Sequence, residues 1–225
     1  MIVVTGASRG LGRAIADRLV AQGQEVLGLA RNVDDLPFPA MACDVADHDA
    51  VKAVARDLRK AKAEVTALIN AAGVAAMNLA VTTPQATTEK VIRINLLGTI
   101  YCCQLLAPLM MRRNAGSIVN FSTIAVALGL KGESIYVASK AGVEGFSRAF
   151  AREMADFGIR VNCVAPGPID TALLRGISGD QIGKIVAQQI FPEQFTPDAV
   201  CDIVELLLDP RSAAISGEVL NVGGA

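Results

Sequence analysis

The chain of 225 residues contains no tryptophan and one histidine. Its phenylalanines and tyrosines make up only 4% of the sequence. Its core must therefore be built mainly from Ala, Val, Leu and Ile. The single histidine, His48, lies in the polar run Asp47–Asp49, where the first turn of a helix is expected. The sequence thus offers no Ser-His-Asp triad and argues against a zinc site built on histidines.

The cysteines show no Cys-x-x-Cys spacing, so neither a paired metal-binding motif nor a dithiol redox motif is present. We interpret them as reduced packing residues, expect no metal site, and expect a cytoplasmic protein. They are Cys43, Cys102, Cys103, Cys163 and Cys201.

Charge is nearly balanced, with a formal net charge of −1, so nothing favours nucleic acid or an anionic membrane as a partner. Pro, Gly or a charged residue interrupts each apolar run before the roughly 20 residues that a membrane helix needs. The first residues, Met1–Gly6, read as a strand entering a turn, so no signal peptide is expected.

Apolar strand-like runs alternate with helical stretches along the whole chain. Strands are expected at 2–5, 25–29, 67–70, 117–121, 160–164 and 218–222, and helices at 11–21, 50–60, 89–113, 136–157 and 197–208. This order predicts one α/β domain over residues 1–225, a Rossmann-type doubly wound parallel sheet of about seven strands with helices on both faces. Ligands are expected at the carboxyl ends of the strands.

Residues 170–194 depart from this rhythm, because three glycines follow the turn Pro166–Pro168. The segment is either a substrate flap over the site or an ordinary surface insertion. Its apolar side chains favour a pocket that tolerates apolar substrates, although they could equally pack on the domain itself. They are Leu173, Leu174, Ile182, Ile185 and Phe191.

A glycine cluster follows the first strand and opens the first helix. Gly6, Gly10 and Gly12 have the spacing G-x-x-x-G-x-G. Glycines let the backbone turn tightly and approach a pyrophosphate, while the helix amino terminus supplies N–H donors. An isolated cluster could be a simple turn, but this place in an α/β pattern predicts a dinucleotide phosphate loop.

The second strand ends in Ala30-Arg31-Asn32, without the acidic residue that usually binds the ribose of NAD. Arg9 in the glycine loop and Arg31 at the strand end could instead converge on a 2′-phosphate, which a guanidinium suits well. Either arginine could also be a solvated surface cation. Together the two positions favour NADP(H).

Tyr136 and Lys140 lie four residues apart, which places both side chains on one face of a helix. A free phenol titrates near pH ~10 and is a poor base at neutrality. A fixed cation beside it would lower that pKa and make the phenol useful in proton transfer.

With these residues assembled, the chain closely resembles the short-chain dehydrogenases/reductases over essentially its whole length. The resemblance rests on seven ordered landmarks, which are Thr5-Gly6-x-x-x-Gly10-x-Gly12, Cys43-Asp44-Val45, Asn70-Ala71-Ala72-Gly73, Asn95, Tyr136-x-x-x-Lys140, Pro166-Gly167 and Ser216-Gly217-x-x-x-x-Val222-x-Gly224.

The resemblance implies a proton relay in which Tyr136 donates to the carbonyl oxygen and Lys140 lowers the phenol pKa and binds ribose hydroxyls. Asn95 would anchor a water of that relay, or cap broken backbone bonds in the long helix. The implied cofactor-binding residues are Gly6, Ser8, Arg9, Gly10, Leu11, Gly12, Arg31, Asn32, Asp44, Val45, Asn70, Ala71, Ala72, Gly73, Tyr136, Lys140, Pro166, Gly167, Ile169 and Thr171.

The hydroxyl that polarises the carbonyl is expected thirteen residues before the tyrosine, where this chain has Thr123 next to Ser122. Threonine offers the same O–H group as the usual serine. Adjacent strand residues point to opposite faces, so only one of the two can reach the substrate. Spacing favours Thr123.

The nearest general relatives in this resemblance are 3-oxoacyl-carrier-protein reductases, which implies reduction of a ketone, with a 3-oxoacyl thioester as a candidate. An acyl carrier protein is acidic and would need a basic docking face. Arg112-Arg113 is expected near the site mouth, but Phe157 replaces an arginine common in such reductases. A small non-acyl ketone or alcohol stays open.

A catalytically silent NADPH-binding regulator is the alternative from another class, although the presence of Tyr136, Lys140 and Asn95 favours an enzyme. The resemblance also implies a homodimer or homotetramer in which the helices at 89–113 and 136–157 pair with their symmetry mates. The apolar side chains of these two helices could instead pack entirely against the sheet.

Overall fold

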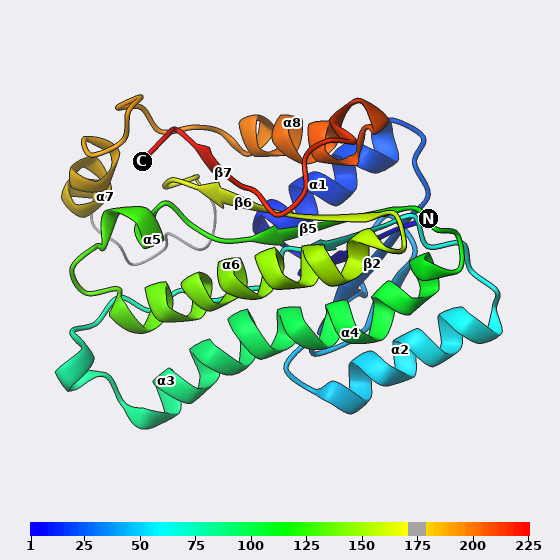
Figure 1. Ribbon diagram of the computed structural model, residues 1–225. Helices are drawn as coiled ribbons and strands as arrows, with labels where there is room; N and C mark the ends of the chain where they lie inside the picture. The colour runs from blue at the N-terminus through cyan, green and yellow to red at the C-terminus, as the bar shows by residue number, and fades with distance from the viewer. Residues whose placement is uncertain (171–178) are drawn as a thin grey trace.

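The computed structural model describes residues 1–170 and 179–225. Seven parallel strands form one sheet in the order β3-β2-β1-β4-β5-β6-β7, so the predicted Rossmann-type doubly wound α/β fold is confirmed (Figure 1). The strands are β1 (Ile2–Thr5), β2 (Val26–Ala30), β3 (Ala40–Ala42), β4 (Ala67–Asn70), β5 (Gly116–Phe121), β6 (Ile159–Pro166) and β7 (Val219–Val222).

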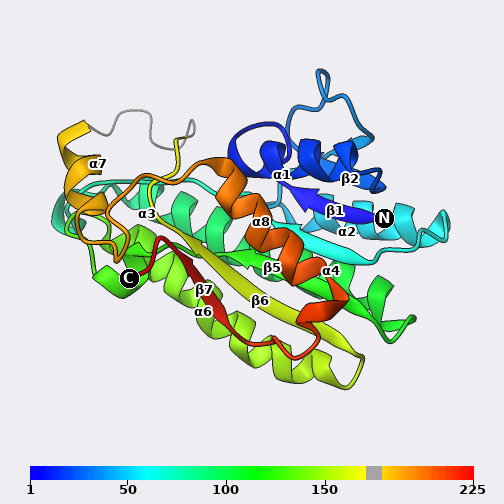
Figure 2. The same cartoon turned by 90° about the horizontal axis from the view of Figure 1, so that it is seen from above.

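Helices cover both faces of this sheet. In Figures 1 and 2, α1 and α8 lie on one face, and α2, α4 and α6 lie on the other. The α-helices are α1 (Gly10–Ala21), α2 (His48–Lys60), α3 (Gln85–Ile92), α4 (Gly98–Met111), α5 (Ala125–Leu128), α6 (Ser134–Ala155), α7 (Gly179–Val186) and α8 (Pro197–Leu208). Short 3₁₀ turns occur at η1 (Ala80–Thr82) and η4 (Pro210–Ser212).

Alternation along the strands divides the core into two layers. Val3 and Leu68 point into the cluster under α2, α4 and α6, whereas Val4 and Ile69 point into the cluster under α1 and α8. Successive strand residues face opposite sides of a sheet, so a continuous apolar strand feeds both layers. Aliphatic side chains fill most of both clusters, as the composition predicts.

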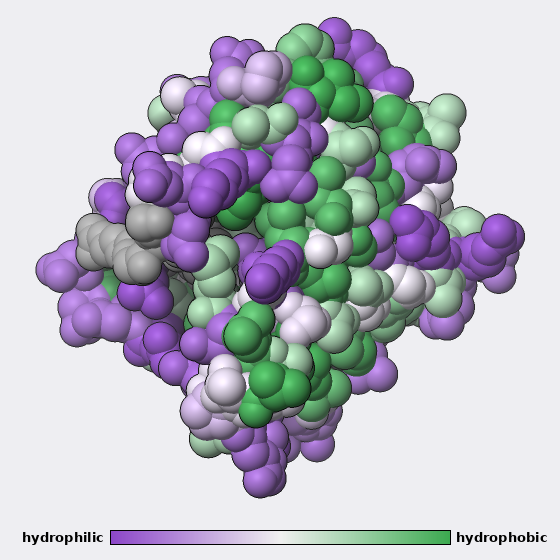
Figure 3. Space-filling model, turned by 90° about the vertical axis from the view of Figure 1, so that its left-hand side faces the viewer, coloured by the Kyte–Doolittle hydropathy of each residue, from purple (hydrophilic) through white to green (hydrophobic). Residues whose placement is uncertain are grey.

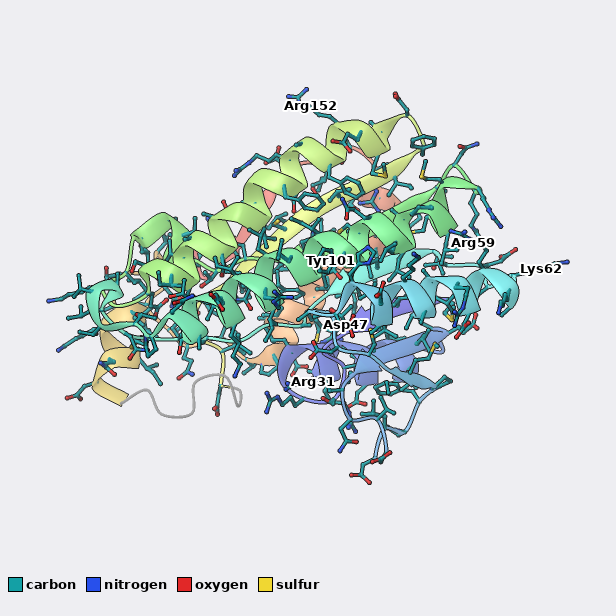
Figure 4. All side chains as sticks on the ribbon, turned by 90° about the horizontal axis from the view of Figure 1, so that it is seen from below. Arg31, Asp47, Arg59, Lys62, Tyr101 and Arg152 are labelled. Carbon is teal, nitrogen blue, oxygen red and sulfur yellow. The ribbon has the colours of Figure 1, made fainter. Side chains whose placement is uncertain are left out.

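The start of α2 explains the single histidine. Asp47 caps the helix, because its carboxylate accepts hydrogen bonds from the N–H groups of Asp49 and Ala50. His48 packs edge-on against the ring of Tyr101 in α4, with 5.2 Å between the ring centroids. Figure 4 shows Asp47 and Tyr101 where α2 and α4 lie side by side. The histidine therefore has a packing role here.

The long helix expected at 89–113 is one continuous helical stretch over Gln85–Met111. A π-helical segment, η2 (Arg93–Leu97), joins α3 to α4, and Pro108 sits inside α4 without ending it. By length and composition alone the stretch could cross a membrane. Half of its most apolar window is buried in this fold, where it packs against β4, β5 and α6.

Three further elements differ from the expectations. The edge strand β3 was not predicted, since it has only three residues and lies between prolines and a polar turn. The short helix α5 and the helix α7 were not predicted either. Helix α7 lies in the expected flap, while Thr171, Leu173 and Leu174 lie outside the described residues.

The pair Arg112-Arg113 does not lie at the expected place. Helix α4 runs antiparallel to the strands, so its carboxyl end lies beside the amino ends of β4 and β5 (Figure 1). There the guanidinium of Arg113 pairs with Glu64, at 2.7 Å. The expectation that this pair borders the mouth of the site is wrong within one chain, because ligands bind at the opposite, carboxyl ends of the strands.

Candidate active site

A cavity of about 470 Å³ opens at the carboxyl ends of the strands, and it collects most of the predicted site residues. Figure 3 faces this end of the molecule and shows apolar surface gathered between polar side chains. The predicted residues that line the cavity are Gly6, Ser8, Arg9, Gly10, Leu11, Arg31, Asp44, Val45, Ala71, Ala72, Gly73, Ser122, Thr123, Tyr136, Lys140, Pro166, Gly167 and Ile169.

Four predicted residues are described but do not line this cavity, namely Gly12, Asn32, Asn70 and Asn95. Asn32 stabilises its own turn, where its side-chain oxygen accepts a hydrogen bond from the N–H of Asp34 at 3.0 Å. The others support the cavity wall from behind, as described below.

The glycine loop has the shape of a phosphate cradle. Gly6 has a positive φ of 68°, and a Cβ there would lie 2.8 Å from the Cα of Ala72. A Cβ at Gly12 would lie 2.5 Å from the carbonyl oxygen of Gly6, so Gly12 is needed for the packing of α1 against the loop. No side chain caps the amino end of α1, so its N–H groups face the loop as donors.

Arg9 and Arg31 both line the cavity and are both exposed. Neither guanidinium forms an ion pair with any residue in the described ranges. Figure 4 shows the side chain of Arg31 projecting from the ribbon next to the first loop. Two unpaired guanidinium groups on the wall of one cavity can bind an anionic group there.

Asn70 and Asn95 link elements behind the wall of the cavity. The amide of Asn70 donates to the side-chain oxygen of Asn120 at 2.8 Å, between neighbouring strands. Asn95, in the π-helical segment, accepts from the N–H of Val74 and donates to its carbonyl, both at 2.9 Å. It also donates to the hydroxyl of Ser139 at 3.1 Å. Asn95 therefore ties the loop after β4 to α6, rather than capping its own helix.

The two neighbouring hydroxyl groups have different partners. Ser122 donates to the carboxylate of Glu144 at 2.6 Å, which turns it toward α6. The Thr123 hydroxyl lies near the phenol of Tyr136 and lowers its pKa, and its oxygen accepts a hydrogen bond from the N–H of Ala125 at 3.3 Å. Thr123 is thus the hydroxyl next to the tyrosine, in agreement with the spacing.

Tyr136 and Lys140 are both buried in one wall of the cavity, on the first turns of α6. The ammonium of Lys140 donates to the carbonyl oxygen of Phe121 at 2.8 Å. Burial lowers the pKa of Lys140 to about 8. The lysine is therefore cationic at neutral pH, but it becomes neutral in the mildly alkaline range.

The expected lowering of the phenol pKa by Lys140 is not seen in this structure. Burial raises the pKa of Tyr136 above its ordinary value, and the negative charge of Glu133 raises it further. The hydrogen bond with Thr123 acts in the opposite direction. Desolvation and the charge of Glu133 disfavour the phenolate more strongly than Thr123 favours it, so the phenol is held in its protonated form.

Comparison with known proteins agrees with this geometry. A family model described as enoyl-(acyl carrier protein) reductase matches residues 6–224. The 3-oxoacyl-[acyl-carrier-protein] reductase FabG of Salmonella typhimurium is 34% identical over 231 residues, covering 99% of this chain and 95% of that protein. FabG of Staphylococcus aureus is 34% identical over 239 residues, with coverage of 99% and 96%. The chain belongs to the short-chain dehydrogenases/reductases.

A solved structure extends the same result. The ligand-free aldohexose dehydrogenase of Thermoplasma acidophilum superposes with a TM-score of 0.90 at 31% identity, covering 99% of this chain and 92% of that one. The protein is therefore an oxidoreductase of this family that uses a nicotinamide cofactor. The glycine cradle, which has no room for added side chains, fits the pyrophosphate of such a cofactor.

Several residues that shape this short-chain dehydrogenase/reductase site were not predicted. Glu133 lines the cavity three residues before Tyr136, and its i, i+3 spacing was the available signal. Glu144 holds Ser122. Gln189 is buried against Gly167, where an added Cβ would collide with its side-chain oxygen. No spacing in the sequence links Gln189 to that turn.

No group of three or more His, Cys, Asp or Glu side chains lies close enough to hold a metal ion in the part of the chain that the structure describes. All five cysteines lie within that part, and each is buried as a free thiol.

Proposed function

We propose that this short-chain dehydrogenase/reductase reduces a ketone to a secondary alcohol with NADPH. The observation that carries the proposal is that Thr123 and Tyr136 line the same cavity, with the Thr123 hydroxyl close enough to the phenol to lower its pKa. Two O–H groups at one point can donate together to a carbonyl oxygen between them. The bound cofactor supplies the hydride.

The chain's own residues supply the proton and the geometry. Tyr136 is protonated at neutral pH and therefore suits the role of proton donor to the developing alkoxide. Thr123 donates a second hydrogen bond that polarises the carbonyl. Lys140, held by its hydrogen bond to the carbonyl of Phe121, would bind the ribose hydroxyls of the cofactor beside Tyr136.

NADPH is the proposed cofactor because Arg9 and Arg31 are unpaired within the described residues and no carboxylate stands at the end of β2. A 2′-phosphate would satisfy both guanidinium groups. The remaining proposed cofactor contacts are those of the cavity-lining residues from the loops after β1, β2, β3, β4 and β6, with Asp44 and Val45 in the loop after β3.

The proposed substrate enters beside the apolar side chains of Met77, Leu130 and Ile182, which line the cavity. The FabG relatives are named for 3-oxoacyl-carrier-protein substrates, so a 3-oxoacyl thioester, carried by an acyl carrier protein, is one candidate. The aldohexose dehydrogenase similarity favours a second candidate, a small hydroxylated substrate. Within one chain, Arg112-Arg113 cannot supply a basic docking face for the first.

We propose a cytoplasmic homodimer or homotetramer. On α6, Phe150 and Met154 are buried in the core cluster under α2, α4 and α6, and Val143 is also buried. Ala141 and Ala149 stay exposed on α6, and Ile100 on α4 is partly exposed, which leaves a face of small and apolar side chains for a second copy. A light-scattering mass near that of one 23.4 kDa chain at micromolar concentration would contradict the oligomer.

The function is tested by NADPH oxidation, followed at 340 nm, against a panel of ketones that includes a short 3-oxoacyl thioester and hydroxylated ketones. Turnover of at least one ketone that disappears in Tyr136→Phe is expected. NADPH binding by titration without turnover of any ketone would contradict the proposal and favour the silent regulator.

A further inference from the structure

Glu133 is a carboxylate that the proposed proton relay does not use. It lines the same cavity as Tyr136 and Lys140, and it is only 8% exposed. Its side chain forms no hydrogen bond or ion pair with any residue in ranges 1–170 and 179–225. A carboxylate of such low exposure, without a protein partner, can form hydrogen bonds only with what enters the cavity.

The position of Glu133 in the fold does not explain this burial. Glu133 is the N-cap residue of α6, where a carboxylate could accept hydrogen bonds from the first N–H groups of the helix. Its side chain makes no such cap bond. The backbone of Glu133 still takes part in the helix, since its carbonyl accepts from the N–H of Val137 at 2.7 Å. The carboxylate itself is left free in the cavity.

The charges around the cavity restrict what Glu133 can receive. An anionic group would be repelled by the carboxylate. A cationic group would lie in a cavity that already holds the buried ammonium of Lys140, so a second cation is disfavoured there. A neutral hydroxyl is a donor without either penalty, and a hydrogen bond from it to a carboxylate is charge-assisted.

We propose that Glu133 accepts a hydrogen bond from a hydroxyl group of the substrate next to the reacting carbon, so that the enzyme selects hydroxylated ketones over ketones without this group. The proposal rests on the proposed ketone reduction and names its substrate class. It places a specificity-determining contact three residues before Tyr136, one helical turn from the proton donor.

Removal of a substrate donor would leave the carboxylate buried and unpaired in the complex. Sites built to hydrogen-bond a substrate hydroxyl discriminate strongly against the analogue that lacks it. A selection of about tenfold or more between matched ketones is expected from one charge-assisted hydrogen bond. The raised pKa of Glu133, caused by its burial, agrees with a carboxyl group that lacks a protein partner.

The test compares hydroxyacetone with methoxyacetone, because both carry an electron-withdrawing oxygen next to the carbonyl and only the first has a donor. We expect kcat/KM of the wild-type enzyme with NADPH to be about tenfold or more higher for hydroxyacetone. In Glu133→Leu this ratio should fall to near one, and Glu133→Gln, which keeps an acceptor without the charge, should be intermediate.

Glu153→Gln is the matched control, because Glu153 is an exposed carboxylate on the same helix, far from the cavity. It should leave the ratio unchanged. An equal ratio in wild type and Glu133→Leu would overturn the inference. A higher kcat/KM for aminoacetone than for hydroxyacetone would overturn the choice of a hydroxyl in favour of a cation.

A binding measurement separates this inference from the proposed function. Binding of 1,2-propanediol and of 1-methoxy-2-propanol to the NADP⁺ complex can be measured by calorimetry even where no ketone is turned over. Tighter binding of the diol by wild type and loss of that preference in Glu133→Gln support the role of Glu133. Equal binding of the two alcohols by wild type would overturn it, whatever the ketone assay shows.

Discussion

The two sides of the cavity are built from different parts of the chain. On the cofactor side the wall is mainly backbone, where the loops after β1 and β4 approach so closely that a Cβ at Gly6 would strike Ala72. On the substrate side the wall is mainly side chains, from Glu133, Tyr136 and Ile182. Backbone walls tolerate almost no substitution, whereas a wall of side chains can change one residue at a time.

This difference separates what the fold requires from what the substrate requires. The cofactor side is held by parallel strand pairing, with Thr5 and Asn70 in register on β1 and β4. The substrate side includes α7, whose residues have no fully buried side chain. A change on the substrate side therefore alters specificity with little effect on folding, while a change in the glycine loop affects both.

Tyr136→Phe should have the largest effect, because the phenol lies where the two sides of the cavity meet. The substitution keeps the ring and removes the proton donor, so ketone reduction should fall by about 10²–10⁴-fold, the usual contribution of general acid catalysis. NADPH affinity, measured by fluorescence titration, should stay nearly unchanged. Near-normal reduction in this variant would remove Tyr136 from the mechanism.

The neighbouring hydroxyls give a paired test with nearly as large an effect. Thr123→Ala removes the donor beside Tyr136, so kcat should fall by about 10²–10³-fold with little change in stability. Ser122→Ala instead leaves Glu144 without its 2.6 Å partner. It should cost about 1–3 kcal/mol of unfolding free energy, measured by denaturant titration, and lower kcat less.

The opposite result for this pair would exchange the two roles. An active Thr123→Ala enzyme together with an inactive but stable Ser122→Ala enzyme would assign carbonyl polarisation to Ser122.

Arg31→Asp tests the cofactor side alone. It replaces a proposed phosphate partner with a ribose partner, and it repels a 2′-phosphate. The ratio of kcat/KM with NADPH to kcat/KM with NADH should fall by about 10–100-fold, the value of one or more charge-assisted hydrogen bonds. Arg59→Asp is the control, since Arg59 lies on α2 away from the cavity (Figure 4). An unchanged ratio in Arg31→Asp would argue against NADPH as the preferred cofactor.

The smallest expected effect is a shift in a pH profile. Glu133 raises the pKa of the Tyr136 phenol through its negative charge, so Glu133→Gln should lower that pKa. In the oxidative direction, where the phenolate acts as base, the rising limb of kcat/KM should move to lower pH by up to about one unit. A shift to higher pH would contradict this electrostatic contact.

Lys140 titrates near the same range, since burial lowers its pKa to about 8. The profile should therefore also be measured in Lys140→Arg, whose side chain keeps its charge throughout. If the rising limb of the pH profile persists in Lys140→Arg, it reports titration of the phenol. If it disappears, it reports titration of the lysine. Arginine has a different shape, so partial activity at best is expected in this variant.

The sequence predicted the cofactor side well because backbone geometry there depends on residue type at fixed spacing. Gly6, Gly10 and Gly12 follow a strand and open a helix, and few other structures need glycine at these three places. The alternation of apolar strands and helices predicted the parallel sheet for the same reason, since it reflects local periodicity. The edge strand β3 was not predicted because three residues are too few to show an alternation of apolar and polar side chains.

Spacing also identified Tyr136, Lys140 and Thr123, but it could not give their electrostatics. The phenol was expected to be acidified by Lys140, yet in the structure the ammonium bonds to the Phe121 carbonyl. Burial, which no spacing reports, is the largest influence on the pKa of Tyr136. The misplacement of Arg112-Arg113 has a similar cause, because the direction of α4 relative to the strands decides which end they occupy.

The sequence by itself thus determined the family, the sheet, the glycine loop and the proposed catalytic side chains. Only the tertiary structure decided that Thr123 rather than Ser122 meets Tyr136, that Asn95 holds the loop after β4, and that Glu133 is buried without a partner. The physical reason is range: glycine conformations and helical spacing are local, whereas burial and hydrogen-bond partners arise when segments far apart in the chain are packed together.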